Sequence, residues 1–242
     1  MLSRTSMALA MLLFSSVTKA QLVYYWDFTS GSVIDSVSGV TALLGNPAGL
    51  SAAGYTFTDV GEGIRVDQPG GLAVSSTYTI ELVFSLDYND AEYQRLIDFS
   101  DFDIDEGMYA YDDYFYFYDQ SPDEDTYTFS ADEIVTLQLS RDGLTDLVIA
   151  SLNGTEIWRF TDSNGYAEFA AANNVMHFFE DDSSEHPAGT VREIRVFASV
   201  ASSGASAQAV TSLPFAGLII LVAVLGWLGS RRARGTDKST FP

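Results

Sequence analysis

The stretches TYTIELVF, residues 77–84, and TVREIRVF, residues 190–197, decide the fold class of this chain. In both stretches β-branched and aromatic residues recur with period two, as in a strand that buries one face. Between residues 21 and 198 no stretch has a convincing helical period. The pattern therefore predicts a domain built from strands.

Other short segments also have strand composition, and turn signals separate them. The first long strand is expected to run from Thr77 to Leu86, and the other expected strands are residues 22–28, 95–99, 108–111, 114–118, 134–140, 146–151, 156–160 and 174–179. The dipeptides Asp142-Gly143 and Asn153-Gly154 favour tight hairpins because they accept positive φ. Many short strands with regular turns predict an all-β antiparallel two-sheet sandwich.

The order of these features resembles the laminin-G-like, concanavalin A-like jelly roll. The resemblance rests on YWDF at residues 25–28, DSVSG at 35–39, the strand from residue 78 to 86, LQLSRDG at 137–143, LNG at 152–154 and VREIRVF at 191–197. It covers residues 22–198 and implies one domain, residues 21–198. That fold carries lectins, adhesion modules and glucanases, so function must be argued from the site.

The N-terminus has the architecture of a signal peptide. Arg4 precedes an apolar run at residues 7–14, and small or apolar residues three apart, Val17 and Ala20, precede Gln21. The apolar run is too short to span a bilayer. Residues 1–20 are therefore expected to be a cleaved export signal.

The C-terminus has the pattern of a membrane anchor. Residues 213–229 contain no charge, and as a helix they would rise about 26 Å, close to a hydrocarbon core of about 30 Å. Arg231, Arg232 and Arg234 follow, so residues 230–242 are expected to be a basic cytoplasmic tail. Residues 199–212 are uncharged and predict a flexible stalk. The domain is thus expected outside the cytoplasm, held by a transmembrane helix.

The same segment resembles the PEP-CTERM type of bacterial sorting tail. The shared features are Pro214 at the entry, a short apolar span and an arginine cluster. The resemblance implies processing by an exosortase-type enzyme, with release to the cell surface or matrix. The chain departs from the family because it lacks the Pro-Glu-Pro signature and eight residues follow Arg234. A permanent anchor and a hydrophobic docking segment are the alternatives.

Composition excludes several classes of function. Only six arginines and no lysine accompany 32 acids between residues 21 and 230, a net charge of −26. Such a surface repels phosphate backbones, so no nucleic acid is expected as a partner. Cysteine is absent, which excludes disulfides, thiolate metal sites and a cysteine nucleophile.

The acids have two interpretations. Solvation alone explains an acidic surface. Alternatively, some carboxylates bind Ca²⁺, a hard cation that takes oxygen ligands. Asp181 and Asp182 are the expected ligands because they directly follow an aromatic strand, at a rim where the laminin-G-like resemblance places Ca²⁺. Solvated loop acids are the alternative.

A catalytic interpretation concerns residues 101–106, DFDIDE. Retaining β-glucanases of this broad fold carry a Glu-x-Asp-x-x-Glu pattern on a strand, and alternation would put Asp101, Asp103 and Asp105 on one face. Asp101 would then stand where the nucleophilic Glu belongs, with Glu106 as the acid. A nucleophile one methylene short is a serious defect, because the two carboxyl groups must lie about 5 Å apart. The sequence therefore predicts that the protein is not an enzyme. A degenerate glucanase is the alternative.

An aromatic run at residues 114–118 supplies the candidate ligand site. Alternation should send Tyr114, Tyr116 and Tyr118 outward and Phe115 and Phe117 into the core. Outward tyrosines can stack on sugar rings and hydrogen-bond sugar hydroxyls. Ordinary cross-strand aromatic pairing is the competing interpretation.

These features lead to one hypothesis with two alternatives. The hypothesis is an exported, non-enzymatic binding or adhesion module for a glycan or an extracellular protein, with Ca²⁺ as the candidate cofactor. The alternatives are a structural envelope or matrix protein without a discrete ligand, and the degenerate glucanase.

Overall fold

A computed structural model of the chain describes residues 20–68, 74, 76–87, 92–121, 128–169, 174–181 and 185–200. The chain divides into two compact units, residues 1–205 and 206–242, and every described residue lies in the first. The predicted signal peptide, apart from Ala20, and the predicted span at residues 213–229 fall outside the described residues. Within the described part of the chain, no helix has the length and apolarity to cross a membrane.

The described residues form fourteen strands and two 3₁₀ turns. The strands are β1 Leu22–Asp27, β2 Leu43–Leu44, β3 Leu50–Ser51, β4 Gly54–Phe57, β5 Ile64–Asp67, β6 Tyr78–Leu86, β7 Tyr93–Asp98, β8 Gly107–Tyr111, β9 Tyr114–Phe117, β10 Val135–Asp142, β11 Leu147–Leu152, β12 Thr155–Thr161, β13 Val175–Phe178 and β14 Gly189–Phe197. The turns are η1 Phe28–Ser30 and η2 Pro47–Gly49.

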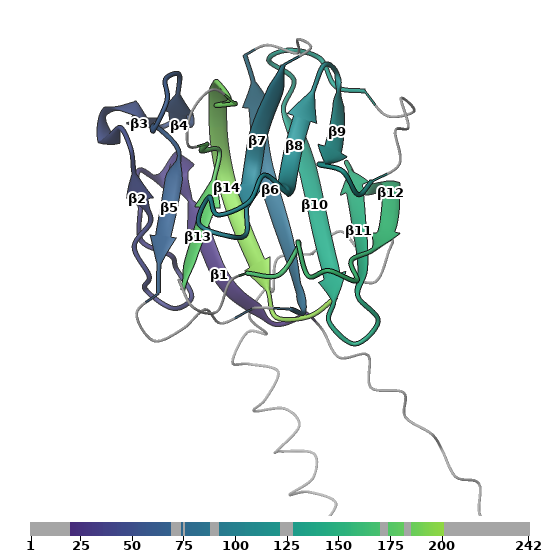
Figure 1. The fold of residues 1–242 in the computed structure, drawn as a ribbon. Helices are drawn as coiled ribbons and strands as arrows, with labels where there is room; N and C mark the ends of the chain where they lie inside the picture. Colours follow the sequence, from purple (N-terminus) through teal and green to yellow (C-terminus); the bar gives the residue numbers. More distant parts are fainter. Residues whose placement is uncertain are drawn as a thin grey trace, which may run out of the picture. The chain divides into compact units, whose positions relative to one another are not determined.

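The strands form two antiparallel sheets that pack face to face (Figure 1). One sheet has the order β12-β11-β10-β6-β14-β4-β3, with β1 also paired to β14. The other has the order β2-β5-β13-β7-β8-β9. The predicted all-β antiparallel two-sheet sandwich is confirmed.

The core lies between the sheets and is rich in aromatic rings. From β6, Ile80, Leu82 and Phe84 are at most 1% exposed. Phe84 contacts Phe115 of β9 edge to face, with ring centroids 5.9 Å apart. Phe117 of the same strand is fully buried. The inward positions of β9 therefore belong to the core, as the alternation predicts.

Strand β14 departs from the regular alternation that its sequence suggests. Its register against β6 shifts between Val191 and Glu193, so that Val191 and Ile194 are both fully buried. The extra residue at this bulge changes the phase of the alternation. The predicted strand at residues 190–197 is confirmed, but the prediction that its side chains alternate strictly with period two was wrong at the bulge.

The two predicted hairpin turns have different outcomes. Asn153 and Gly154 both adopt positive φ, 50° and 83°, between β11 and β12, as the dipeptide predicts. Between β10 and β11, Asp142 still belongs to the strand, and the positive φ of 56° falls on Asp146. A four-residue connection thus replaces the expected tight turn.

Candidate functional site

The outer surface of β7, β8 and β9 carries a row of tyrosines. The register pairs Tyr93 with Tyr111 and Tyr111 with Tyr114, and it pairs Tyr109 with Tyr116. Because paired residues project from the same face of a sheet, these rings gather on one side. Phe115 and Phe117 occupy the opposite, buried side of β9.

We call this cluster the tyrosine face: Tyr93, Tyr109, Tyr111, Tyr114, Tyr116 and Tyr118. Tyr93 is central, because its ring centroid lies 4.5 Å from that of Tyr111, 5.7 Å from that of Tyr118 and 5.8 Å from that of Tyr109. Tyr114 joins through Tyr111 at 5.7 Å, and Tyr116 through Tyr118 at 6.3 Å. These distances are those of interacting aromatic rings.

The predicted ligand residues Tyr114, Tyr116 and Tyr118 all belong to the tyrosine face. Tyr118 is 36% exposed and Tyr114 and Tyr116 are half-buried, so their rings lie at the surface. The expected cross-strand aromatic pairing is also present, and it is what assembles the cluster. Sequence reasoning left Tyr93 out, because its place opposite Tyr111 depends on a strand pairing that composition does not reveal.

A buried arginine supports the tyrosine face from one side. Arg95 of β7 is 2% exposed, and its guanidinium carbon lies 5.1 Å from the centroid of the Tyr109 ring. Arg95 Nε also donates to the Tyr109 hydroxyl at 2.5 Å, and that hydroxyl donates to the Asp105 carbonyl oxygen at 2.9 Å. Burial raises the pKa of Tyr109 despite the neighbouring guanidinium. Tyr109 is therefore a fixed, neutral ring at the base of the cluster.

Two buried carboxylates neutralise Arg95. Its Nη1 lies 2.8 Å from Asp98 Oδ2, and its Nε lies 3.1 Å from Asp181 Oδ1. The side chains of Asp98 and Asp181 are at most 2% exposed. A buried ion pair broken by removal of one partner is costly, so this cluster is expected to be rigid.

This arrangement bears on the expected calcium site. Asp181 already faces a cation, Arg95, whereas a Ca²⁺ ligand would face the metal. Asp182 lies outside the described residues. Among the residues that the structure describes, no group of three or more His, Cys, Asp or Glu side chains is placed to hold a metal ion. Calcium binding at Asp181 and Asp182 stays a prediction.

The segment expected to be a catalytic strand is a loop. Residues 99–106 lie between β7 and β8, and Asp101 and Phe102 adopt left-handed φ of 59° and 65°. The alternation that would place Asp101, Asp103 and Asp105 on one strand face therefore does not apply, and that expectation was wrong.

Asp101 instead binds a buried histidine. His177 of β13 is 2% exposed, with Nε2 2.8 Å from Asp101 Oδ1 and Nδ1 3.1 Å from Glu180 Oε2. The Phe102 ring packs on the imidazole, with centroids 4.2 Å apart. Burial lowers the pKa of His177, but hydrogen bonds to Glu180 and Asp101 outweigh it and leave the pKa raised. The imidazole thus links the 99–106 loop to the segment that follows β13.

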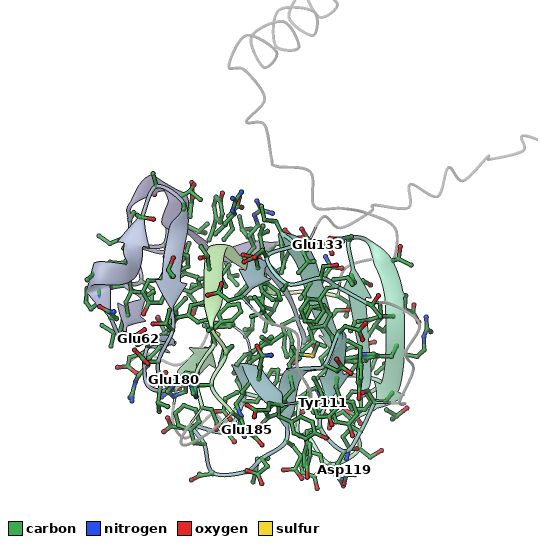
Figure 2. The ribbon with its side chains drawn as sticks, turned by 90° about the horizontal axis from the view of Figure 1, so that it is seen from above. Glu62, Tyr111, Asp119, Glu133, Glu180 and Glu185 are labelled. Carbon is green, nitrogen blue, oxygen red and sulfur yellow. The ribbon has the colours of Figure 1, made fainter. Side chains whose placement is uncertain are left out.

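Acidic side chains lie on the same side of the molecule as the tyrosine face. Figure 2 shows Glu180, Glu185, Tyr111 and Asp119 along one side of the sandwich, with Glu133 on the opposite side. Asp119 is also tied to the cluster directly, because its backbone N donates to the Tyr116 hydroxyl at 3.1 Å. The candidate site is therefore an aromatic surface with an acidic border.

No protein-family model and no curated protein matches this chain. Among solved structures, it is similar to domain 4 of AbnA, an extracellular GH43 arabinanase from Geobacillus stearothermophilus, in complex with arabinotriose. The TM-score is 0.55 at 15% identity, over 76% of this chain and 95% of that chain.

The chain is also similar to the binding domain of botulinum neurotoxin serotype D, with a TM-score of 0.54, 9% identity and 76% of this chain covered. A ligand-binding domain of the same serotype, in complex with N-acetylneuraminic acid, gives a TM-score of 0.53 at 10% identity, again over 76% of this chain. This chain spans about half of the toxin domains, 49% and 48% of their lengths. At such identities the likeness shows a β-sandwich fold, which a jelly roll fits.

Proposed function

We propose that this protein is a non-enzymatic glycan-binding module and that the tyrosine face is its binding surface. The observation that carries the proposal is the assembly of five tyrosine rings on three adjacent strands with a sixth, Tyr118, which directly follows β9 at the surface. A sugar ring offers an apolar face for stacking and hydroxyls for hydrogen bonds, and tyrosine complements both.

The support beneath the rings favours binding. Arg95, Asp98 and Asp181 fix Tyr109 through buried contacts, and neighbouring rings limit the motion of Tyr93 and Tyr111. A surface that is already ordered loses less conformational entropy when a ligand binds. Exposed aromatic patches on folded domains commonly mark interaction sites.

The similar structures are consistent with this proposal, since one contains arabinotriose and another N-acetylneuraminic acid. The loop conformation of residues 99–106 favours a binding module over a glucanase, because the carboxylates required on one strand face are not arranged that way. Calcium is not required by the proposal, because Arg95 already provides positive charge to Asp181.

We further propose that the module works outside the cytoplasm. This part rests on the sequence patterns of residues 1–20 and 213–234. The export signal would place the domain outside, and the apolar segment would hold it at a membrane or deliver it to an exosortase-type enzyme.

The test is binding of the full-length chain to a broad glycan array, followed by affinity measurement on the best ligand. The double variant Tyr116→Ala and Tyr118→Ala should lose at least about tenfold in affinity, because each ring contributes about 0.5–1.5 kcal/mol beyond its buried area. Tyr25→Ala is the matched control, since Tyr25 packs on Arg195 and belongs to the other sheet. An equal loss of affinity in the double variant and in Tyr25→Ala would contradict the proposal. Binding of the chain to proteins but to no glycan would also contradict it.

A further inference from the structure

The charge around the tyrosine face restricts the kind of glycan that it can accept. Five acidic residues lie close to these tyrosines along the chain or contact one of them through their backbone: Glu92, Asp105, Asp112, Asp113 and Asp119. Four of them are next to a tyrosine in the sequence. The fifth, Asp105, accepts a hydrogen bond from the Tyr109 hydroxyl through its backbone carbonyl oxygen. The Asp105 side chain is 87% exposed, and Glu92, Asp112 and Asp119 are exposed as well.

One positive charge on these strands lies near a border carboxylate, because Arg95 Nη2 lies 3.8 Å from Asp105 Oδ1. Arg95 is the one basic residue of β7, β8 and β9. Arg95 is buried, and its single positive charge faces two negative charges, those of Asp98 and Asp181. The rings therefore lie in a region of negative potential.

The spacing makes this potential effective at physiological salt. Consecutive Cα atoms are about 3.8 Å apart, whereas the Debye length at 0.15 M ionic strength is about 8 Å. The backbone of Asp112, Asp113 or Asp119 thus lies within one Debye length of the backbone of a neighbouring tyrosine. Tyrosine rings themselves also attract cations over their faces.

We infer that the tyrosine face selects glycans that carry protonated amino groups and discriminates against acidic glycans. This inference rests on the proposed function and adds the chemical class of the ligand. It separates this chain from the similar toxin domain that was solved with the acidic sugar N-acetylneuraminic acid.

Three oligosaccharides of equal length test the inference on the full-length chain: a β-1,4-linked glucosamine hexamer, its N-acetylated counterpart and hexagalacturonate. At about pH 5 the amines are protonated, because this pH lies far below the pKa of about 7.7 of an α-amino group, whereas carboxyl groups with a pKa of about 4 stay ionised. At low salt the amine should bind about tenfold more tightly than the neutral hexamer, and the ratio should approach one at about 0.5 M salt because charges are screened. The acidic hexamer should bind most weakly.

Charge-removing variants locate the effect. Asp112→Asn together with Asp119→Asn should reduce the ratio of the affinity for the amine to the affinity for the neutral hexamer, both measured on the same variant. Asn suits both positions, because Asp112 and Asp119 have φ of 52° and 59° and Asn tolerates that region. Asp132→Asn is the matched control, with φ of 62°. Its neighbour Glu133 lies on the opposite side of the sandwich in Figure 2.

The outcomes separate the inference from the proposed function. Equal or tighter binding of the neutral or acidic hexamer, still lost in the tyrosine double variant, would overturn the inference and leave glycan binding in place. Failure of all three hexamers and of the glycan array would overturn both. A preference for the amine that Asp132→Asn reduces as much as the double variant would also overturn the inference.

Discussion

Arg95 is a cationic side chain and His177 a titratable one. Both project from the outer side of a sheet, where the alternation of strand residues would expose them to solvent, and yet both are buried. Both are 2% exposed, and both are held by carboxylates: Asp98 and Asp181 around Arg95, Asp101 and Glu180 around His177. The sequence shows these acids as an excess of charge, and only the fold shows which of them serve as internal partners.

For single residues, the sequence predicted which way a side chain points better than it predicted which partner that side chain contacts. The outward direction of Tyr116 follows from period two and is seen in the alternating burial of β9. The partner of Asp181 could not be predicted, because Arg95 lies 86 residues earlier and comes close only through the sheet. The calcium prediction was made from acids that are adjacent in the sequence, and nothing in that part of the sequence indicates that Arg95 pairs with Asp181.

His177 should make stability depend on pH. The groups that face it are Arg65 on β5, Asp98 on β7, Asp101 on the loop and Glu180 after β13. Its pKa in the folded state is raised above the unfolded value of about 6.5. The stabilisation is therefore fully present below about pH 6.5 and is lost as the pH rises through the folded pKa.

The measurement is urea unfolding of the wild type and of His177→Gln at several pH values. The difference in unfolding free energy between the two proteins should be largest at about pH 6 and should shrink toward about pH 9. A difference that is constant over this range would show that His177 stays in one protonation state and would contradict the assignment.

At the scale of elements, period two was sufficient to find the long strands. Strands such as β6, β10 and β14 coincide with predicted segments to within two residues at each end. The missed strands β2, β3, β4 and β5 have two to four residues each. Such segments are too short to show a period, and their pairing with longer strands defines them.

Irregular backbone explains the remaining differences. The bulge in β14 and the left-handed residues of the 99–106 loop both interrupt alternation. The loop sequence DFDID alternates as a strand would, but Asp98 accepts hydrogen bonds from the backbone N of Ser100 and of Phe102. An Asp side chain that bonds nearby backbone in this way favours a turn.

Strand β9 gives a direct test of the inward and outward assignment. Phe117→Ala should lower the unfolding free energy by about 3–5 kcal/mol, because it removes a fully buried ring from the core. Tyr118→Ala, at the next residue and 36% exposed, should cost much less. Denaturant unfolding of the two variants measures both costs, and similar costs would contradict the structure of this hairpin.

At the scale of the whole molecule, the two sheets present different outer faces. On the outer side of β1, β6 and β14, Arg195 pairs with Glu81 and Glu193 and packs on the Tyr25 ring at 5.1 Å. The outer side of β7, β8 and β9 instead groups five tyrosines, with Tyr118 directly after β9 as a sixth. The fold class could be predicted from alternation, but this asymmetry could not, because it depends on strand order across the sheet.

The most direct test of the central claim is to map where a bound oligosaccharide contacts the full-length chain, by NMR of labelled tyrosine rings. Signals of Tyr93, Tyr111, Tyr114, Tyr116 and Tyr118 should shift during a saturating titration, while that of Tyr25 stays in place. Shifts confined to Tyr25 or to rings outside the tyrosine face, at a ligand concentration that saturates binding, would contradict the account.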